Sequence, residues 1–161
     1  MTIIRKAIVE DARILANLNR AVHEPHVNAQ PENYKPFITD NPALIEVYIE
    51  RIQDESNFIL IAEENNTAVG YVHCVMRERV ENPFIHSNTT CLINELAVAE
   101  NHQSQGIGKL LMEDAMRIGQ ERGAKVFTLG VAAFNHGAIK FYERLGFTIS
   151  SHRMSKSVSD S

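Results

Sequence analysis

Residues 91–122, CLINELAVAENHQSQGIGKLLMEDAMRIGQER, decide the fold. The stretch opens with an apolar run at 91–98, continues through a polar loop that contains Gly106 and Gly108, and ends in a periodic segment at 109–122. This order predicts a buried strand, a tight loop and a helix. A helix that begins at such a loop directs free backbone N–H groups and the positive end of its dipole into the loop. The loop is therefore a predicted anion site, and phosphate is the usual occupant.

Two common phosphate-binding motifs do not fit this loop. A dinucleotide fingerprint needs a small residue at position 111 and an acid near 128, where Leu111 and Thr128 stand. A nucleoside-triphosphate loop needs glycine at 103 and serine or threonine at 110, where Gln103 and Leu110 stand. What remains is a Gln-x-x-Gly-x-Gly pattern, for which the alternative is an ordinary turn at the start of a helix.

A second motif lies downstream of the loop. Residues 125–131 form another apolar strand pattern, and the sequence NHGAIKFYERLGF follows at 135–147. In order and spacing, the loop and this motif resemble the GNAT superfamily of N-acetyltransferases, which hold acetyl-coenzyme A. The resemblance covers residues 91–150, whereas the N-terminal half matches the family only in the order of its elements.

The resemblance implies an α/β (α+β) architecture, the GNAT fold. Its mixed, mostly antiparallel central sheet would have about six to seven strands, with about four helices on its two faces. The length of 161 residues suits one domain. We therefore expect a single N-acetyltransferase domain at 1–157 and a frayed tail at 158–161.

Periodicity and turn residues place the individual elements. Strands are predicted at 2–8, 58–62, 68–77, 90–98, 125–131 and 147–155, with a hairpin turn at 64–67. Helices are predicted at 9–23, from Asn41-Pro42 to residue 53, at 105–122, and from Asn135 onward.

Residues 23–40 are predicted to form a long loop, because three prolines interrupt the segment. It is either a polar loop that lies on the sheet or, as the resemblance implies, a wall of the acceptor groove. His23 and His26 are too isolated to predict a metal site. The loop at 80–89 would lie near the mouth of the active site in the family topology.

Composition limits the possible partners and the compartment. The net charge of −4 makes nucleic acid an unexpected partner and is compatible with a cationic amine. The sequence has neither a continuous apolar signal region nor an apolar run long enough to span a membrane, so we expect a cytoplasmic protein. Cys74 and Cys91 lie in apolar strand patterns, which favours reduced core thiols. A homodimer is an expectation from the family alone.

Acetyl transfer to an amine makes three chemical demands. The amine must be neutral, the thioester carbonyl must be polarised, and the leaving thiolate needs a proton. An alkyl ammonium has a pKa of about 10.4, so its neutralisation near pH 7 costs about 4–5 kcal/mol. A general base must therefore take that proton, usually through water.

Glu95 is the predicted general base. It is an acid within an apolar strand, where an unpaired carboxylate would be costly, so it must face a polar pocket or find partners. The alternative is an acid at the solvated end of the sheet or paired with a lysine. The resemblance supports the catalytic role, because some family members use an acid at this position. His73 is a weaker candidate that fits a core histidine better.

Tyr142 is the predicted general acid. It falls two turns into a helix that Asn135 caps, on one stripe with Ala138, Phe141 and Leu145. The alternative is a core aromatic with a hydrogen-bonded hydroxyl. In the family the matching tyrosine protonates the coenzyme thiolate, and the resemblance implies that Asn135 also contacts the pantetheine arm.

The resemblance also implies a coenzyme site built largely from main-chain atoms. A bulge at Leu96, Ala97 and Val98 would splay two strands, and the pantetheine would pair with the exposed edge. The Val98 N–H would polarise the thioester carbonyl. The pyrophosphate would lie in a cradle formed by Gln103, Ser104, Gln105, Gly106, Ile107, Gly108 and Lys109.

The predicted function is direct N-acetyl transfer from acetyl-coenzyme A to a primary amine of a small molecule or peptide, in a ternary complex. No Ser-His-Asp set or reactive cysteine favours a covalent intermediate. Two alternatives stay open: a protein N-terminal acetyltransferase of the ribosomal-protein type, and a non-catalytic acyl-coenzyme A-binding module. The sequence does not name the acceptor.

Overall fold

The structure, a computed structural model, describes residues 1–158. These residues form two compact units, Met1–Gly130 and a smaller one that begins at Val131. The first unit contains the sheet and most of the helices. The prediction of one domain over residues 1–157 stays a prediction.

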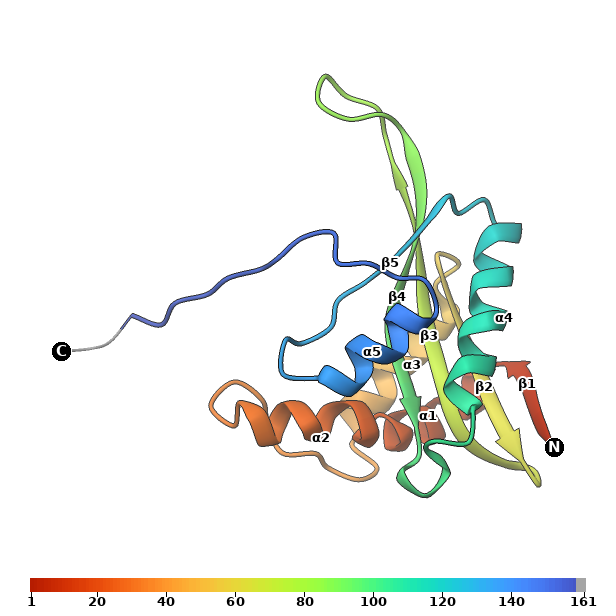
Figure 1. Cartoon of the computed structure of the whole chain (residues 1–161). Helices are drawn as coiled ribbons and strands as arrows, with labels where there is room; N and C mark the ends of the chain where they lie inside the picture. Colours follow the sequence, from red (N-terminus) through yellow and green to blue (C-terminus); the bar gives the residue numbers. More distant parts are fainter. Residues whose placement is uncertain (159–161) are drawn as a thin grey trace. The chain divides into compact units, whose positions relative to one another are not determined.

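A five-stranded sheet forms the centre of the first unit (Figure 1). Its strands lie side by side in chain order, and the first four are antiparallel, whereas the fifth runs parallel to its neighbour. The strands are β1 (Thr2–Lys6), β2 (Asn57–Glu64), β3 (Thr67–Arg79), β4 (Asn88–Val98) and β5 (Val126–Leu129). The mixed, mostly antiparallel sheet is confirmed.

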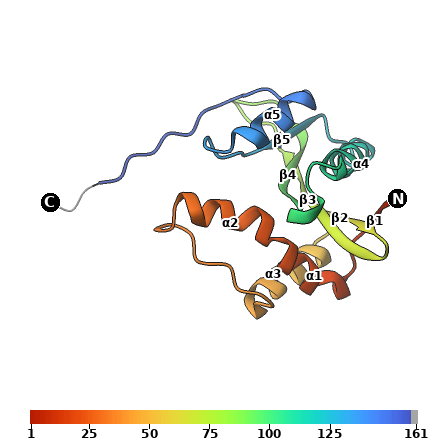
Figure 2. The same ribbon diagram turned by 60° about the horizontal axis from the view of Figure 1, so that its bottom comes forward.

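Helices cover both faces of this sheet (Figure 2). On one face lie α1 (Ala12–Leu18) and α3 (Pro42–Gln53), whose Leu15 and Tyr48 are fully buried against Ile61 and Tyr71. On the other face lies α4 (Ile107–Glu121), which buries Leu111 and Met112. Burial of each such side chain contributes about 1.5–3 kcal/mol, so these two apolar layers hold the sheet between the helices.

Local sequence explains the sharpest turn of the sheet. Asn65 and Asn66, which join β2 to β3, have φ angles of 50° and 62°. A two-residue hairpin needs this left-handed backbone, and asparagine adopts it more readily than most residues. The predicted hairpin turn is confirmed.

The first helical segment is divided, and the predicted loop after it is shorter than expected. Residues 9–23 form a 3₁₀ turn, Val9–Asp11, then α1, and then the start of α2 (Arg20–Ala29). Pro25 lies inside α2. A proline within a helix removes one hydrogen bond, here to the carbonyl of Ala21, and does not have to end the helix. The predicted loop at 23–40 is therefore wrong for residues 23–29.

The rest of that segment folds back onto α2. The His23 Nε2 atom is within 2.5 Å of the Lys35 carbonyl oxygen, and the rings of His26 and Tyr34 lie 5.0 Å apart. The Arg20 guanidinium lies 5.7 Å from the centre of the Phe37 ring. These contacts tie residues 30–40 to the helix that precedes them.

The second unit contains one helix, α5 (His136–Arg144), followed by residues 147–158 without regular structure. The strand predicted at 147–155 is therefore wrong, and the described sheet has five strands rather than six or seven. The physical reason is composition: after Ile149, itself 63% exposed, residues 150–153 are Ser, Ser, His and Arg, which offer no alternating apolar face. The tail predicted at 158–161 lies outside the described residues except for Val158.

Candidate functional site

The edge of β4 that faces β5 is open over its last residues. β4 and β5 pair only between residues 90–93 and 126–129. In the described part of the chain, no strand pairs with residues 94–98 on that side. A row of peptide groups therefore has no strand partner beside the end of β5.

A β-bulge marks the point where the two strands part. His73 pairs with Glu95 and Cys74 pairs with Ile93, so Asn94 is an extra residue in β4. A bulge bends and twists its strand, which explains why the parallel pairing stops at Ile93. The bulge expected at residues 96–98 is thus wrong in position, because the register interruption lies at Asn94.

Hydrogen-bond alternation identifies the peptide groups on the open edge. The Ala99 N–H donates to the Val69 carbonyl at 2.8 Å. Because bonded positions alternate along an antiparallel pair, the peptide groups of Ala97 also face β3. Those of Leu96 and Val98 face the open side. Of the three residues predicted from the resemblance, only Leu96 and Val98 thus present their own N–H and C=O groups to the edge.

Gln103 joins the open edge to the loop that follows. Its side-chain Nε2 donates to the Val98 carbonyl at 3.0 Å. This bond satisfies the outward carbonyl of Val98 and leaves the outward N–H of Val98 and both outward groups of Leu96. The first residue of the predicted cradle therefore also fixes where the loop leaves the strand.

The predicted phosphate loop has the backbone that an anion site needs. Ser104 and Gly106 have φ angles of 64° and 83°, and Gly106 precedes the first residue of α4. The first intrahelical bond runs from Leu110 N–H to the Gly106 carbonyl at 3.1 Å. The N–H groups of the first turn of α4, from Ile107 to Lys109, therefore lack an intrahelical partner and lie at the positive end of the dipole.

The side chains of this loop differ in exposure. Gln103, Ser104, Gln105 and Gly106 are exposed, whereas Ile107 is buried in the core and anchors the start of the helix. Gly108 is half-buried. The Lys109 ammonium lies 3.8 Å from the Glu113 carboxylate, one turn along α4, so part of its charge is already compensated.

Glu95 lies in a polar cluster on the α1–α3 face of the sheet. Its Oε1 accepts from Arg51 Nη1 at 2.9 Å and lies 2.8 Å and 3.0 Å from the hydroxyls of Tyr48 and Tyr71. These hydroxyls are 2.7 Å apart, so one donates to the other and the remaining one donates to Oε1. Its Oε2 lies 3.5 Å from Asn19 Nδ2. The predicted need for polar partners is met by an arginine and two tyrosines, rather than by solvent or a lysine.

The two tyrosines keep their hydroxyl protons near neutral pH and can therefore donate hydrogen bonds. Burial, and then the charge of Glu95, raises the pKa of Tyr48 and Tyr71 well above the ordinary value. Both side chains are fully buried. Sequence analysis missed Tyr48, Tyr71, Arg51 and Asn19 as site residues. The one available signal was that Tyr48 and Arg51 stand three apart on one helix face.

His73 is a buried, neutral histidine. Burial, and then the charge of Arg51, lowers its pKa to about 4. Its Nδ1 accepts from Asn94 Nδ2 at 3.0 Å, and its Nε2 bonds to Asn57 Oδ1. Because both ring nitrogens are engaged, the ring has no free nitrogen to take a proton from a substrate.

Asn135 and Tyr142 belong to the second unit. Asn135 caps α5, where its Oδ1 accepts from the Ala138 N–H at 3.1 Å. The Tyr142 ring packs edge-on against Phe141 and Phe147, with ring centres 5.2 Å and 5.9 Å apart. Burial raises the pKa of Tyr142 above its ordinary value, so the phenol keeps its proton near neutral pH.

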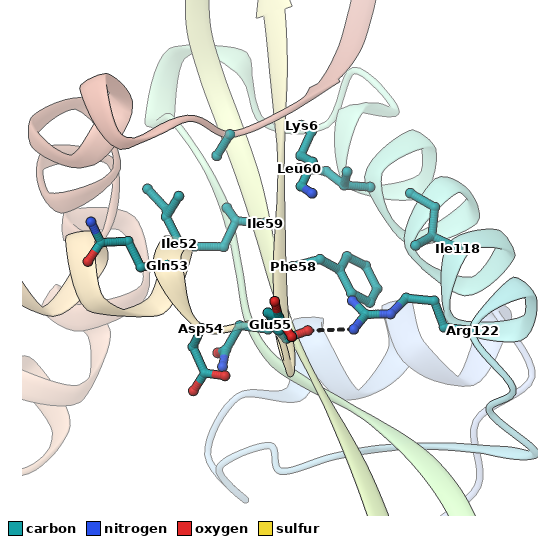
Figure 3. A pocket seen from close by; sticks show the side chains of 12 residues that line it. Lys6, Ile52, Gln53, Asp54, Glu55, Phe58, Ile59, Leu60, Ile118 and Arg122 are labelled. Atoms are coloured by element: carbon teal, nitrogen blue, oxygen red, sulfur yellow. Dashed lines mark hydrogen bonds between the residues drawn. The ribbon is translucent and has the colours of Figure 1, made fainter.

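A cavity of about 400 Å³ lies at the other end of α4 (Figure 3). Arg122 lines it, donates to the Glu55 carbonyl at 2.6 Å and lies over the Phe58 ring. A helix rises 1.5 Å per residue, so this cavity is roughly 20 Å from the start of α4. It takes no part in the site around β4 and the loop.

A metal-binding cluster and a membrane-spanning helix are both absent from the described residues. Residues 1–158 contain no cluster of three or more histidine, cysteine, aspartate or glutamate side chains arranged to hold a metal ion. Within the same range, no helix has both the length and the apolar content to cross a membrane. Cys74 and Cys91 are free and buried.

The chain matches the Acetyltransferase (GNAT) family over residues 22–147. It is 35% identical over 95 residues to an uncharacterized N-acetyltransferase, MJ1207, of Methanocaldococcus jannaschii. The matched stretch covers 59% of this chain and 40% of that protein. It is 30% identical over 103 residues to N-alpha-acetyltransferase 30 of Schizosaccharomyces pombe. That match covers 63% of this chain and 64% of the relative. The chain thus spans less than two thirds of both relatives.

Solved structures resemble the whole chain. A mutant of the BH1408 protein from Bacillus halodurans superposes with a TM-score of 0.90 at 25% identity, covering 98% of this chain and 99% of that one. The aminoglycoside N-acetyltransferase AAC(6')-Iy in complex with CoA has a TM-score of 0.77 at 17% identity, covering 98% and 95%. The second likeness concerns the fold alone.

Proposed function

Because the chain belongs to the acetyltransferase (GNAT) family, we propose that it transfers the acetyl group of acetyl-coenzyme A to a primary amine. One observation carries this proposal: Gln103, bonded to the Val98 carbonyl, joins the open edge at Leu96 and Val98 to the loop that begins α4 at residues 106–109. A ligand with an amide-rich arm and a diphosphate matches both features. The amides of pantetheine would pair with the strand edge, and the diphosphate oxygens would accept hydrogen bonds from the free N–H groups of α4.

The carbonyl of the thioester is the reacting group. An N–H on the open edge, that of Val98, donates to the carbonyl oxygen and stabilises the negative charge that develops there. Gln103 supports this arrangement, because its bond to the Val98 carbonyl holds the same peptide segment in place. Asn135 and Lys109 are further proposed contacts to the coenzyme, on the family resemblance.

The proposed transfer proceeds directly in a ternary complex. Glu95, acting directly or through water, takes a proton from the acceptor ammonium, and the freed nitrogen lone pair attacks the carbonyl carbon. The C–N bond forms, the C–S bond breaks, and the leaving thiolate takes a proton that Tyr142 supplies. The nitrogen then loses its second proton, which returns to the Tyr142 oxygen through solvent. One ammonium and one thioester thus give one amide, one thiol and one released proton.

The acceptor is a small primary amine in our first proposal. The full-length likeness to an aminoglycoside acetyltransferase is compatible with such a substrate. A protein N-terminus is the second candidate, which the 30% identity to N-alpha-acetyltransferase 30 favours. The cytoplasmic location and the homodimer stay predictions.

Thiol release from acetyl-coenzyme A tests this function. The panel contains polyamines, aminoglycosides, free amino acids and peptides with a free N-terminus, each beside its N-acetylated form as a matched control. We expect release with at least one free amine and none with its blocked counterpart. Coenzyme binding without release for any member would instead support the non-catalytic binding module.

A further inference from the structure

The two carboxylate oxygens of Glu95 have unequal surroundings. Oε1 lies 2.8–3.0 Å from Arg51 Nη1 and from the hydroxyls of Tyr48 and Tyr71. The two hydroxyls are 2.7 Å apart and carry one hydrogen each, so one donates to the other and the remaining one donates to Oε1. Arg51 and one tyrosine hydroxyl therefore occupy both lone pairs of Oε1. In the described residues Oε2 has one donor, Asn19 Nδ2, at 3.5 Å, which is the outer limit of a hydrogen bond. Only Oε2 therefore has free capacity to accept a proton.

Arg51 is itself held in place. Its guanidinium lies 5.1 Å from the centre of the Tyr48 ring, and both residues lie on α3. The N-terminus of α3 is fixed because Asn41 accepts from the Ala43 N–H at 3.1 Å. The Arg51–Glu95 pair is sheltered, with side chains 27% and 17% exposed. The ion pair is therefore screened much less than one at the surface.

We propose that Arg51, together with the Tyr48 and Tyr71 hydroxyls, positions Glu95 so that Oε2 takes the proton of the acceptor ammonium. The inference rests on the proposed transferase function. Arg51 and the tyrosines touch Glu95 and not the reacting atoms, so they are positioning residues. In the step itself, the N–H bond of the ammonium breaks, its electron pair stays on nitrogen, and the proton goes to Oε2, directly or through one water.

The experiment compares kcat and KM at one pH for Arg51→Met. Loss of this contact lets the carboxylate leave its position, so kcat should fall about 10-fold while the KM for acetyl-coenzyme A stays near the wild-type value. Arg51→Lys keeps the charge and should restore most of kcat. In a Glu95→Gln background, Arg51→Met should cause no further loss of kcat, because the group that Arg51 positions is absent.

Two variants keep the test decisive. Arg117→Met removes an arginine from an exposed pair on α4 and should leave kcat unchanged. If Arg51→Met does not fold, Tyr48→Phe removes one hydroxyl beside Oε1 while it keeps the ring, and should lower kcat in the same way. A wild-type kcat in these folded variants would overturn the inference, as would a further loss of kcat in the Glu95→Gln background. Absence of thiol release by the wild type would instead refute the proposed function.

Discussion

Asp11 combines an ion pair with a turn cap in one buried carboxylate. Its two oxygens each lie 2.8 Å from a guanidinium nitrogen of Arg5, and Oδ2 also accepts from the Ile8 N–H at 2.8 Å. Arg5 additionally pairs with Glu63 on β2. The Arg5 hydrogen bonds hold the pKa of Asp11 below its ordinary value. The carboxylate thus links β1 to the start of the first helical segment.

Asp11→Asn should lower the free energy of unfolding by about 2 kcal/mol at neutral pH, because a buried charged hydrogen bond is lost. A lowered folded-state pKa means that the contribution is present above the unfolded value and is lost as pH falls through the folded value. The difference between wild type and variant should therefore narrow below pH 4. Urea unfolding from pH 3 to pH 7 measures this. Asp114→Asn, on the exposed face of α4, is the control and should change stability little at any pH.

Tyr142→Phe addresses the proposed general acid. We expect kcat to fall by about 10²–10⁴-fold, since the thiolate would leave without its proton donor. Binding of acetyl-coenzyme A should persist, because the ring and its packing against Phe141 and Phe147 remain. Steady-state kinetics with calorimetric binding separates the two effects. Wild-type turnover in this variant would remove Tyr142 from the mechanism.

Helix α4 packs against the sheet through a glycine. A Cβ at Gly119 would lie 2.5 Å from the Phe127 ring on β5, closer than real contacts allow. Gly119→Ala should therefore lower the free energy of unfolding by about 1–3 kcal/mol through overpacking. Gly137→Ala is the matched control, because that glycine is also helical and a Cβ there meets nothing within 4 Å. It should leave stability equal or higher by thermal unfolding. Equal losses in both variants would refute the packing explanation.

Elements with a strong local signal were predictable from the sequence. The helix predicted at 105–122 is α4, because its apolar spacing, a glycine before its first turn and Gly123 after its end all agree. Two predictions of elements were wrong. Pro25 removes a single hydrogen bond from α2, so treating it as a stop was wrong. The strand expected at 147–155 did not form, because residues 150–153 carry no apolar alternation.

The candidate site, too, could be predicted only in part from the sequence. The loop at 103–109 was found because its signal is local. The partners of Glu95 were not, since Tyr48 and Arg51 are 47 and 44 residues away and only the packing of α3 onto the sheet brings them together. The bulge at Asn94 depends on the register of two strands, which no side-chain pattern in β4 alone reveals.

At the scale of the whole molecule, a ligand that binds only the folded chain must protect it from unfolding. At acetyl-coenzyme A concentrations 100 times the dissociation constant, stabilisation is about 2.7 kcal/mol. For a chain of this length we expect a rise in Tm of about 5–10 °C. Differential scanning fluorimetry measures the shift, with acetate at equal concentration as the control. No protection at millimolar acetyl-coenzyme A would contradict the proposed coenzyme site.

The open edge of β4 has a consequence for how such a protein can diverge. Leu96 and Val98 offer peptide groups, and every amino acid except proline carries the same N–H donor. A substitution at either position therefore keeps the outward N–H group unless the new residue is proline. Related proteins can therefore differ in sequence at both positions and still present the same backbone N–H and C=O groups. A ligand that pairs with the strand edge can then be bound in the same way by proteins of low sequence identity.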